Sequence, residues 1–401
     1  MEVPRPAYGF EFGEPPKDIR SSYDVVVIGL GGLGAAALYW VARKQKAGEV
    51  SVLGLEQYDL FHHRGGSQDH SRIIRLAQSA PWYTKIAPHM YFALLPRVAW
   101  KTVEDEAGIE LVHRTGGLVF GPKDNKDLDD YARAMAVNEV PFDDLTAEEA
   151  MKRWPQLTLT PNYRVLYQAD AGIVNPRLAN STHITLARKR GAHVLDQTKV
   201  TEIIPIGKEG AKVVTSKGEF TCKRLIICAG PWTNHCLKPF GLEVPIKTTK
   251  EQITYWATPN LREFSPSRFP VWISVEEKDC YYGFPVYGEV GTKAGVHIGG
   301  KEVDPDTRGF EPDVDLLNNI EAYMAKTMPG ARSMLPSTLP GTPILTDTFL
   351  TFNCNPVGPR LYTKTCLYAN TLDDDLIVDT LPNFPQVSLT VGCTCKEAFL
   401  V

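Results

Sequence analysis

Residues 24–56 read DVVVIGLGGLGAAALYWVARKQKAGEVSVLGLE and contain the signals that decide the fold. Residues 24–28 are β-branched and almost purely apolar, which is typical of a strand buried on both faces of a parallel sheet. Residues 35–45 are rich in helix formers and end with basic side chains, which favours a helix. Residues 50–56 have the pattern of a second buried strand. Together these segments predict a strand–helix–strand unit.

A glycine motif, G-x-G-x-x-G, connects the first strand to the helix and consists of Gly29, Gly31 and Gly34. In this context the first glycine permits a tight turn, the second lets the backbone approach a pyrophosphate, and the third lets helix and strand pack closely. The helix N-terminus attracts the anion. Glu56 ends the second strand where an acceptor for ribose hydroxyls is expected, and its charge disfavours NADP. The motif predicts a dinucleotide site and leaves NAD and FAD open.

The composition is that of a globular protein of two to three domains. The chain has 401 residues, 43% of them hydrophobic, which is enough for a sizeable core. Its net charge of -4 gives no continuous positive field for nucleic acid. It contains no apolar run long enough to span a membrane, and its first residues lack a secretory signal. We expect an intracellular protein with a loose N-terminal extension at residues 1–22.

The rest of the chain predicts a second domain interleaved with the first. Residues 82–153 have a helical pattern and are expected to leave the sheet, whereas strand patterns return near 165–175 and 225–230. Residues 247–300 alternate aromatic and polar side chains, as in an antiparallel sheet. We therefore expect an α/β protein with a Rossmann-type parallel sheet and a second, mixed antiparallel sheet. The expected ranges are 23–85, 160–240 and 331–401 for the dinucleotide domain and 86–159 and 241–330 for the substrate domain, with a crossover at 329–331.

Eight cysteines in a chain of this length do not predict a dense disulfide framework. Several lie in apolar strand-like runs, such as Cys228 in LIICAG, and are expected to be buried thiols. Cys393 and Cys395 form a pair near the end of the chain but lack a matching Cys/His pair. No metal site is predicted.

Six segments occur in the order known from one flavoprotein family. They are HHRGGSQDHSRIIRLAQ at 62–78, DAGIVNP at 170–176, CAGPWTN at 228–234, YYGFP at 281–285, GTKAGVHIGGKEVDP at 291–305 and KTCLYANTLDDDLIVDTLP at 364–382. The first resembles the segment R-G-S-S-H-G-x-[ST]-R-I-I-R of the monomeric sarcosine oxidase and pipecolate oxidase family. The resemblance covers about residues 23–390 and implies that the dinucleotide is FAD.

The resemblance also implies how the flavin is held. Arg64, Ser67 and Arg72 fall in the family segment that lies beside the cofactor. Cys366 and Tyr368 match the family's K-x-C-x-Y segment, whose cysteine forms a thioether with the flavin ring. Judged by residue type alone, a single cysteine in a strand-like run is a buried small hydrophobe.

The resemblance implies catalytic roles for Arg72 and Tyr368 and for three further residues. Arg75 matches the residue that binds the substrate carboxylate, a task suited to a bidentate guanidinium. Lys293 matches the lysine that assists oxygen reduction, where a fixed cation in a water-poor site stabilises developing negative charge. His297 matches a histidine that lines the substrate cavity. On residue type alone, the two arginines form surface ion pairs on a helix, the lysine is a solvated loop residue, and the histidine is structural.

The chain departs from the family at two places. The motif G-x-G-H-G-[FY]-K should follow PQVSLTVG, but residues 392–401 read GCTCKEAFLV, so the lysine position falls near Phe399 and Lys396 comes three residues early. The family's S-H-G is Ser67-Gln68-Asp69, which removes a histidine and adds a carboxylate near the flavin. We expect weakened substrate affinity or no turnover.

The implied reaction is oxidation of a secondary amino acid, such as sarcosine or L-pipecolate, at its C–N bond to an imine, with O2 reduced to hydrogen peroxide. Tyr281, Tyr282 and Phe284 either line the substrate cavity or form sheet core. An oxidase of bulkier amines, such as glycated amino acids or saccharopine, and a catalytically silent flavoprotein remain alternatives. The resemblance implies a monomer in the peroxisome. Because the chain ends Phe-Leu-Val without an S-K-L-like signal, the cytoplasm also stays open.

Overall fold

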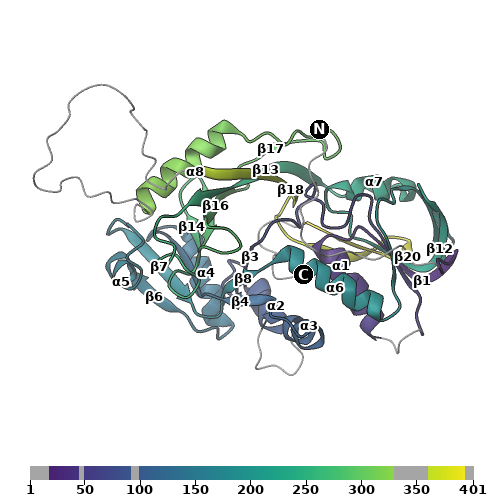
Figure 1. The fold of residues 1–401 in the computed structure, drawn as a ribbon, viewed down its shortest axis with the longest axis horizontal. Coiled ribbons are helices and arrows are strands. Elements are labelled where there is room, and N and C mark those ends of the chain that lie inside the picture. Colours follow the sequence, from purple (N-terminus) through teal and green to yellow (C-terminus); the bar gives the residue numbers. More distant parts are fainter. Residues whose placement is uncertain (1–17, 45–48, 92–98, 329–359, 393–401) are drawn as a thin grey trace, which may run out of the picture.

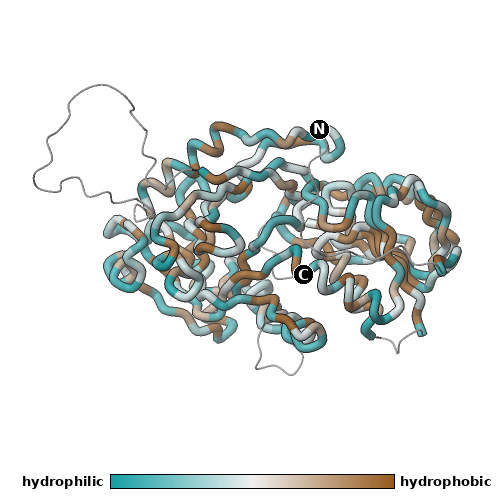
Figure 2. The backbone as a smooth tube through the Cα atoms, in the orientation of Figure 1, coloured by the Kyte–Doolittle hydropathy of each residue, from teal (hydrophilic) through white to brown (hydrophobic). Residues whose placement is uncertain are grey.

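The computed structural model describes residues 18–44, 49–91, 99–328 and 360–392. Two large sheets lie in opposite halves of the molecule, the first to the right and the second to the left in Figure 1. Figure 2 shows hydrophobic residues concentrated in the interior strands and hydrophilic residues over much of the outer helices and loops. Among the described residues, no helix is both long enough and apolar enough to cross a membrane.

The first sheet is built on the predicted strand–helix–strand unit. Strand β1 (Ser22–Ile28) pairs in parallel with β2 (Val52–Leu55) and with β12 (Gly218–Ile227). Parallel pairing of β2 with β9 and of β12 with β20 extends the sheet, and β10, β11 and β19 add antiparallel pairs. The α/β class is therefore confirmed. These further strands are β9 (His193–Leu195), β10 (Val200–Ile206), β11 (Gly210–Thr215), β19 (Ile377–Leu381) and β20 (Phe384–Val391).

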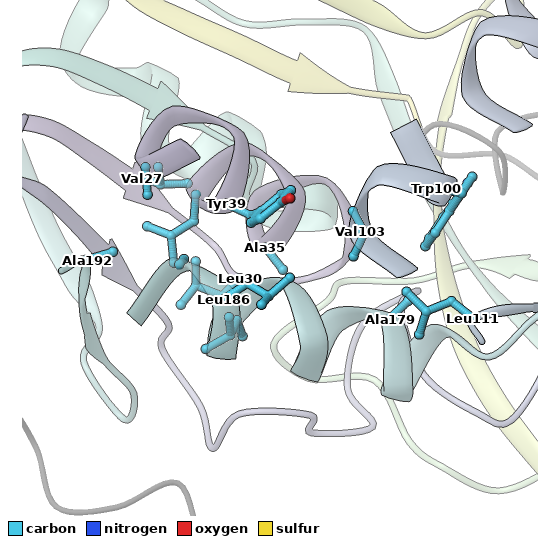
Figure 3. Close-up of a cluster of buried hydrophobic side chains, with 14 of the residues drawn as sticks. Val27, Leu30, Ala35, Tyr39, Trp100, Val103, Leu111, Ala179, Leu186 and Ala192 are labelled. Atoms are coloured by element: carbon cyan, nitrogen blue, oxygen red, sulfur yellow. The ribbon is translucent and has the colours of Figure 1, made fainter. Parts of the chain in front are cut away.

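Helices α1 (Gly32–Lys44) and α6 (Pro176–Lys189) pack against each other beside this sheet. Val27 of β1, Tyr39 of α1 and Ile184 of α6 belong to one buried cluster, part of which is shown in Figure 3. Burying an apolar side chain of this size stabilises the fold by about 1.5–3 kcal/mol. The cluster holds the start of α1, and with it the glycine loop, against the ends of the strands.

The second sheet has the strand order β17-β13-β16-β15-β14-β5-β7-β6, and β18 also pairs with β13. Its neighbouring strands are antiparallel except for β14 and β5, which confirms the antiparallel pattern predicted for residues 247–300. The strands are β5 (Gly117–Pro122), β6 (Asp143–Thr146), β7 (Tyr163–Gln168), β13 (Ile246–Ala257), β14 (Val271–Val275), β15 (Cys280–Phe284), β16 (Gly291–His297), β17 (Lys301–Glu302) and β18 (Arg360–Thr371).

The prediction that residues 82–153 are helical is wrong in part, whereas no described strand of this range joins the first sheet, as expected. Strands β5 and β6 join the second sheet. The β5 sequence GLVFGP is a short apolar run bounded by glycine and proline. When the sequence is searched for helical periodicity over a longer window, so short a run is not distinguished from the residues on either side of it. The helices of the region are α2 (Pro81–Tyr91), α3 (Ala99–Ala107), α4 (Lys126–Val137) and α5 (Ala147–Arg153).

A small third sheet carries the predicted arginine pair. Strand β8 (Gly172–Val174) pairs antiparallel with β3 (Arg72–Ile74) and with β4 (Val112–Arg114). The arginines therefore lie on a strand and at its end, and not on a helix as their spacing alone suggested. Because side chains alternate along a strand, residues three apart tend to point to opposite sides.

The division into two domains stays a prediction. Strand β18, in the range expected for the dinucleotide domain, forms its long antiparallel ladder in the second sheet, from Ile246 opposite Thr371 to Trp256 opposite Arg360. The expected crossover at 329–331 lies outside the described residues, as does the cysteine pair of the C-terminal tail. The remaining helices are α7 (Thr233–Leu237) and α8 (Val314–Thr327), with 3-10 helices at Gly230–Trp232 and Lys238–Phe240.

Candidate cofactor and active site

A cavity of about 230 Å³ opens at the carboxyl ends of the parallel strands β1, β2 and β12. This is where ligands bind in open α/β sheets. Its walls include residues 28–33 of the glycine loop, 55–57 at the end of β2, 228–232 after β12 and 367–369 of β18. The cavity therefore brings together four segments that are distant in the sequence.

The glycine loop has the close backbone contacts that the motif predicts. Gly29 has a φ of +85°, and a Cβ added there would lie 2.5 Å from the carbonyl oxygen of Cys228. A Cβ on Gly34 would lie 1.7 Å from the carbonyl oxygen of Gly29. The backbone N–H of Gly32 donates to Ser67 Oγ at 2.8 Å, and Ser67 also lines the cavity. The N-terminus of α1 thus lines the cavity, and these two glycines allow the loop to pack closely on itself and on the segment after β12.

Glu56 lies at the edge of this loop with 5% of its surface exposed. Its Oε2 accepts a hydrogen bond from Leu30 N at 2.9 Å, and its Oε1 accepts one from Tyr58 N at 3.1 Å. Asn180 of α6 also lines the cavity, and its buried Oδ1 accepts no hydrogen bond from the described residues. An anion-binding helix end, a fixed carboxylate and an unsatisfied amide oxygen fit a dinucleotide with its hydroxyls. No sequence motif marks Asn180.

Two arginines of the 62–78 segment take different positions. Arg72 lines the cavity, where it donates to the carbonyl oxygens of Ser71 at 2.9 Å and Gly66 at 2.6 Å. Burial opposes its charge, but nearby groups including Cys366 raise the pKa of Arg72 overall. Arg64 is exposed, does not line the cavity, and lies over the ring of Tyr58 at 4.8 Å. The predicted cofactor contact of its side chain stays a prediction.

Strand β18 brings the predicted flavin-linking segment to the cavity. Tyr368 lines the cavity and lies 6.0 Å, ring to ring, from His297 at the end of β16. Cys366 is 5% exposed and lies behind this wall, close enough to Arg72, Lys293 and Arg308 to affect the pKa values of all three. Cations of this kind favour the thiolate form of a cysteine, which is the nucleophile.

Lys293 is a buried cation and not a solvated loop residue. It lies on β16 with 1% of its surface exposed, and its Nζ is 2.7 Å from Asp69 Oδ2. The same Nζ donates to the carbonyl oxygen of Ser71 at 2.8 Å and to its Oγ at 3.0 Å, and lies 4.4 Å from the ring centre of Phe284. Burial lowers the pKa of Lys293 to about 8, although Asp69 opposes this shift.

Arg75 lies away from the large cavity. It is 8% exposed, donates to the carbonyl oxygen of Ala77 at 2.6 Å, and has its guanidinium carbon 5.3 Å from the ring centre of Tyr131. It lines a separate hollow of about 10 Å³, together with Gln168 and Trp272. That volume is enough for about one water molecule. The structure therefore does not place Arg75 beside the cavity that Arg72 and Tyr368 line.

The three aromatic residues in the YYGFP segment belong to the sheet interior. Tyr281, Tyr282 and Phe284 are each less than 8% exposed, and none lines the large cavity. Tyr281 stacks on Tyr323 with ring centres 3.8 Å apart and donates to Asn319 Oδ1 at 2.6 Å. Phe284 nevertheless contacts Lys293, and Tyr282 lies close enough to Arg72 to affect its pKa.

Besides Asn180, sequence reasoning missed two buried groups near the site. Glu251 of β13 is opposite Cys366 in the β13–β18 ladder and accepts hydrogen bonds from the backbone N–H groups of Gly299 at 3.1 Å and Gly300 at 3.0 Å. Burial raises the pKa of Glu251. Tyr255, also on β13, donates to Asp69 Oδ2 at 2.9 Å. Both residues lie in strand runs whose sequence pattern predicts only a sheet.

Several known proteins with similar sequences are named as oxidases. The chain is 28% identical over 377 residues to the monomeric sarcosine oxidase of Bacillus sp. (strain B-0618), covering 93% of this chain and 88% of that protein. It is 28% identical over 389 residues to human peroxisomal sarcosine oxidase, with coverage of 93% and 87%. It is 29% identical over 376 residues to N-methyl-L-tryptophan oxidase of Escherichia coli (strain SMS-3-5 / SECEC), with coverage of 92% and 89%.

Solved structures share the fold. NikD, an unusual amino acid oxidase essential for nikkomycin biosynthesis, superposes with a TM-score of 0.76 at 22% identity, covering 95% of this chain and 92% of that one. L-proline dehydrogenase from P. horikoshii has a TM-score of 0.76 at 19% identity, with coverage of 95% and 90%. The model of the FAD dependent oxidoreductase family DAO matches residues 24–369, which includes the glycine loop, Glu56, Lys293 and Cys366. The chain belongs to the DAO family of FAD-dependent oxidoreductases.

Proposed function

We propose that this chain is an oxidase of secondary amino acids of the sarcosine or L-pipecolate type, with FAD attached to Cys366. The observation that carries the proposal is that the cavity built on the glycine loop is also lined by Arg72 and Tyr368, with Cys366 and Lys293 buried close to Arg72. The sequence relatives named sarcosine oxidase and N-methyl-L-tryptophan oxidase support an N-methyl amino acid as the substrate.

The glycine loop and α1 bind the pyrophosphate, and Glu56 and Asn180 position the hydroxyls of the cofactor. When bound, FAD supplies an acceptor for the two electrons of the substrate C–H bond and passes them to O2. Arg72 is fixed by two carbonyl oxygens, so its charge stays at the cavity wall as the reaction proceeds. Cys366, beside three cations, is the residue that would hold the flavin ring through a thioether.

The substrate loses a hydride from the carbon beside nitrogen and a proton from nitrogen, and a C=N bond forms. O2 takes up the two electrons and two protons and becomes hydrogen peroxide. Lys293 contributes a cation where negative charge develops on oxygen. Arg75 binds the substrate carboxylate. Since the hollow beside it is only about 10 Å³, the side chains around Arg75 must move when substrate binds.

Oxygen consumption and peroxide release test the proposal with sarcosine, L-pipecolate and N-methyl-L-tryptophan. Glycine and L-proline separate the amine classes, and fructosyl-glycine tests the alternative of bulkier amines. Equimolar oxygen use and peroxide release with at least one secondary amine support the proposal. Purified flavoprotein that consumes no oxygen with any of these amines contradicts it. The peroxisomal location expected from the resemblance stays a prediction.

A further inference from the structure

Asp69 stands where the family segment has glycine, and its backbone retains a conformation that glycine adopts easily. Its φ is +82°, in the left-handed region. An Asp tolerates this region better than most residues. Both it and Lys293 are nearly inaccessible to water, with side-chain exposures of 3% and 2%. The chain thus carries a buried carboxylate in direct contact with the lysine to which we assign oxygen reduction.

Polar and charged groups from several elements surround this pair. Asp69 Oδ2 contacts Lys293 Nζ at 2.7 Å and accepts from Tyr255 of β13 at 2.9 Å. Asp69 Oδ1 is 3.4 Å from Lys364 Nζ of β18. Arg72 lies close enough to affect the pKa values of both partners, and Cys366 affects that of Lys293.

Burial favours the protonated carboxyl, but Lys293 and Lys364 outweigh it and hold the pKa of Asp69 well below its usual range. The carboxylate is therefore charged at neutral pH and cancels most of the field of one lysine. In a water-poor site that field acts over several ångströms, since little solvent screens it.

We propose that Asp69 is the counter-ion of Lys293 and restrains reoxidation of the reduced flavin by oxygen. The inference rests on the proposed function of Lys293 and deepens it. Reoxidation transfers two electrons and two protons from the reduced flavin to O2 and yields hydrogen peroxide. Negative charge develops on oxygen in this step, so a carboxylate 2.7 Å from the assisting cation opposes it. Asp69 acts through Lys293 and is in this sense a positioning and charge-setting residue.

The holoprotein is reduced anaerobically with dithionite and mixed with oxygenated buffer between pH 6 and pH 9, and the return of the flavin absorbance is followed. Asp69→Asn keeps the size and tolerates the positive φ. At pH 6 it should reoxidise about tenfold faster or more, a change of about 1.4 kcal/mol in the barrier. Its rate should also fall at a lower pH than in the wild type, because loss of the carboxylate lowers the pKa of Lys293 further.

Glu289→Gln is the matched control. Glu289 accepts from Tyr362 at 2.6 Å and is 3.3 Å from His70, so its loss removes a negative charge nearby without touching Lys293. This variant should reoxidise at the wild-type rate, and Lys293→Met should reoxidise more slowly. Asp69→Asn that reoxidises at the wild-type rate, or more slowly, at pH 6 overturns the proposal.

A sulfite titration gives a readout independent of turnover. Sulfite is an anion that bleaches protein-bound flavin, and its dissociation constant should fall in Asp69→Asn, by about tenfold, and stay unchanged in Glu289→Gln. An unchanged constant in both variants contradicts the counter-ion role. A purely structural brace between the sheets predicts lower stability in Asp69→Asn with no change in sulfite affinity.

The two proposals fail separately. Chemical reduction bypasses the amine, so a protein that no amine reduces refutes the amine oxidase and leaves the effect of Asp69 measurable.

If the purified protein holds no flavin, the coupling between Asp69 and Lys293 is measured by urea unfolding of the wild type, Asp69→Asn, Lys293→Met and the double variant. The double variant should be more stable than the sum of the single losses predicts, because neither single charge remains buried alone. Additive losses overturn the ion pair itself.

Discussion

The carboxylate of Glu56 accepts a hydrogen bond from the backbone N–H of Leu30 at 2.9 Å, which joins the end of β2 to the glycine loop. The contact orients the carboxylate along the cavity wall before any ligand binds. Its loss therefore affects both the loop and the ligand. This relationship makes the affinity for the cofactor testable apart from catalysis.

Glu56→Gln should weaken FAD binding about tenfold or more, since an amide replaces a charged acceptor for backbone and ribose groups. The measurement is reconstitution of apoprotein with FAD in the Cys366→Ala background, where no thioether holds the cofactor. Asp24→Asn is the control. Asp24 accepts a hydrogen bond at 2.9 Å from the backbone N–H of Ser51, the residue before β2, and is outside the cavity lining, so its replacement should leave the FAD dissociation constant unchanged.

Gly34→Ala should abolish FAD binding or destabilise the fold by about 3 kcal/mol or more, because the added Cβ would overlap the carbonyl oxygen of Gly29. Gly309→Ala is the control, since a Cβ there meets no atom within 4 Å and no positive φ is involved. Urea unfolding and the flavin-to-protein absorbance ratio check both variants. A Gly34→Ala protein with wild-type flavin content would contradict the close approach.

The pH dependence of stability reports on Lys293. Burial lowers its pKa from 10.5 to about 8 in the folded chain, so between these values the unfolded chain binds a proton that the folded chain does not. The free energy of unfolding from this group therefore rises with pH across that window, by up to about 3 kcal/mol at about 1.4 kcal/mol per unit. Urea unfolding between pH 7.5 and 10.5 should show a smaller rise in Lys293→Met than in the wild type. Equal slopes would contradict the burial of a charged lysine.

Arg75→Met should lower kcat/KM for a carboxylate-bearing amine at least about a hundredfold, since a buried charge-assisted contact is lost. The expected effect lies mainly in KM. Arg75→Lys keeps the positive charge but not the bidentate guanidinium, and should recover part of the lost kcat/KM. Arg133→Met, which is exposed and outside the linings of the cavity and of the hollow, is the control. An unchanged KM in Arg75→Met would mean that the carboxylate binds elsewhere.

Cys366→Ala should release the flavin on acid precipitation, whereas the wild-type precipitate should stay yellow. Cys228→Ala is the matched control, because Cys228 is also buried and lines the cavity near the glycine loop. Its precipitate should stay yellow. A colourless wild-type precipitate with a yellow supernatant would show that the protein binds FAD without a thioether.

The strand–helix–strand unit at residues 24–56 was predictable because its local signals agree. A buried-strand run, a glycine motif and a helix-forming stretch fixed β1, α1 and β2 without information from the rest of the chain. Strand β5 was missed, since its short apolar run becomes a strand only when β14 and β7 pair with it. Short runs of this kind depend on distant partners.

The charge state of the site was not predictable. The sequence shows that Asp69 replaces a family glycine, but the contact with Lys293 depends on how β16 approaches the segment after β2. The separation of Arg75 from Arg72 has a local cause, the alternation of side chains about a strand, which a helical interpretation conceals. Spacing alone cannot choose between these two periods in a segment of four residues.

The measurement that tests the central claim most directly is the visible spectrum of the holoprotein during anaerobic addition of sarcosine or L-pipecolate. The account predicts that the flavin band near 450 nm, typical of oxidised flavin, bleaches with one of these amines in about one equivalent and returns when O2 is admitted, with release of peroxide. A flavin band that persists in excess of both amines, in protein that dithionite bleaches fully, would contradict the proposed amine oxidase.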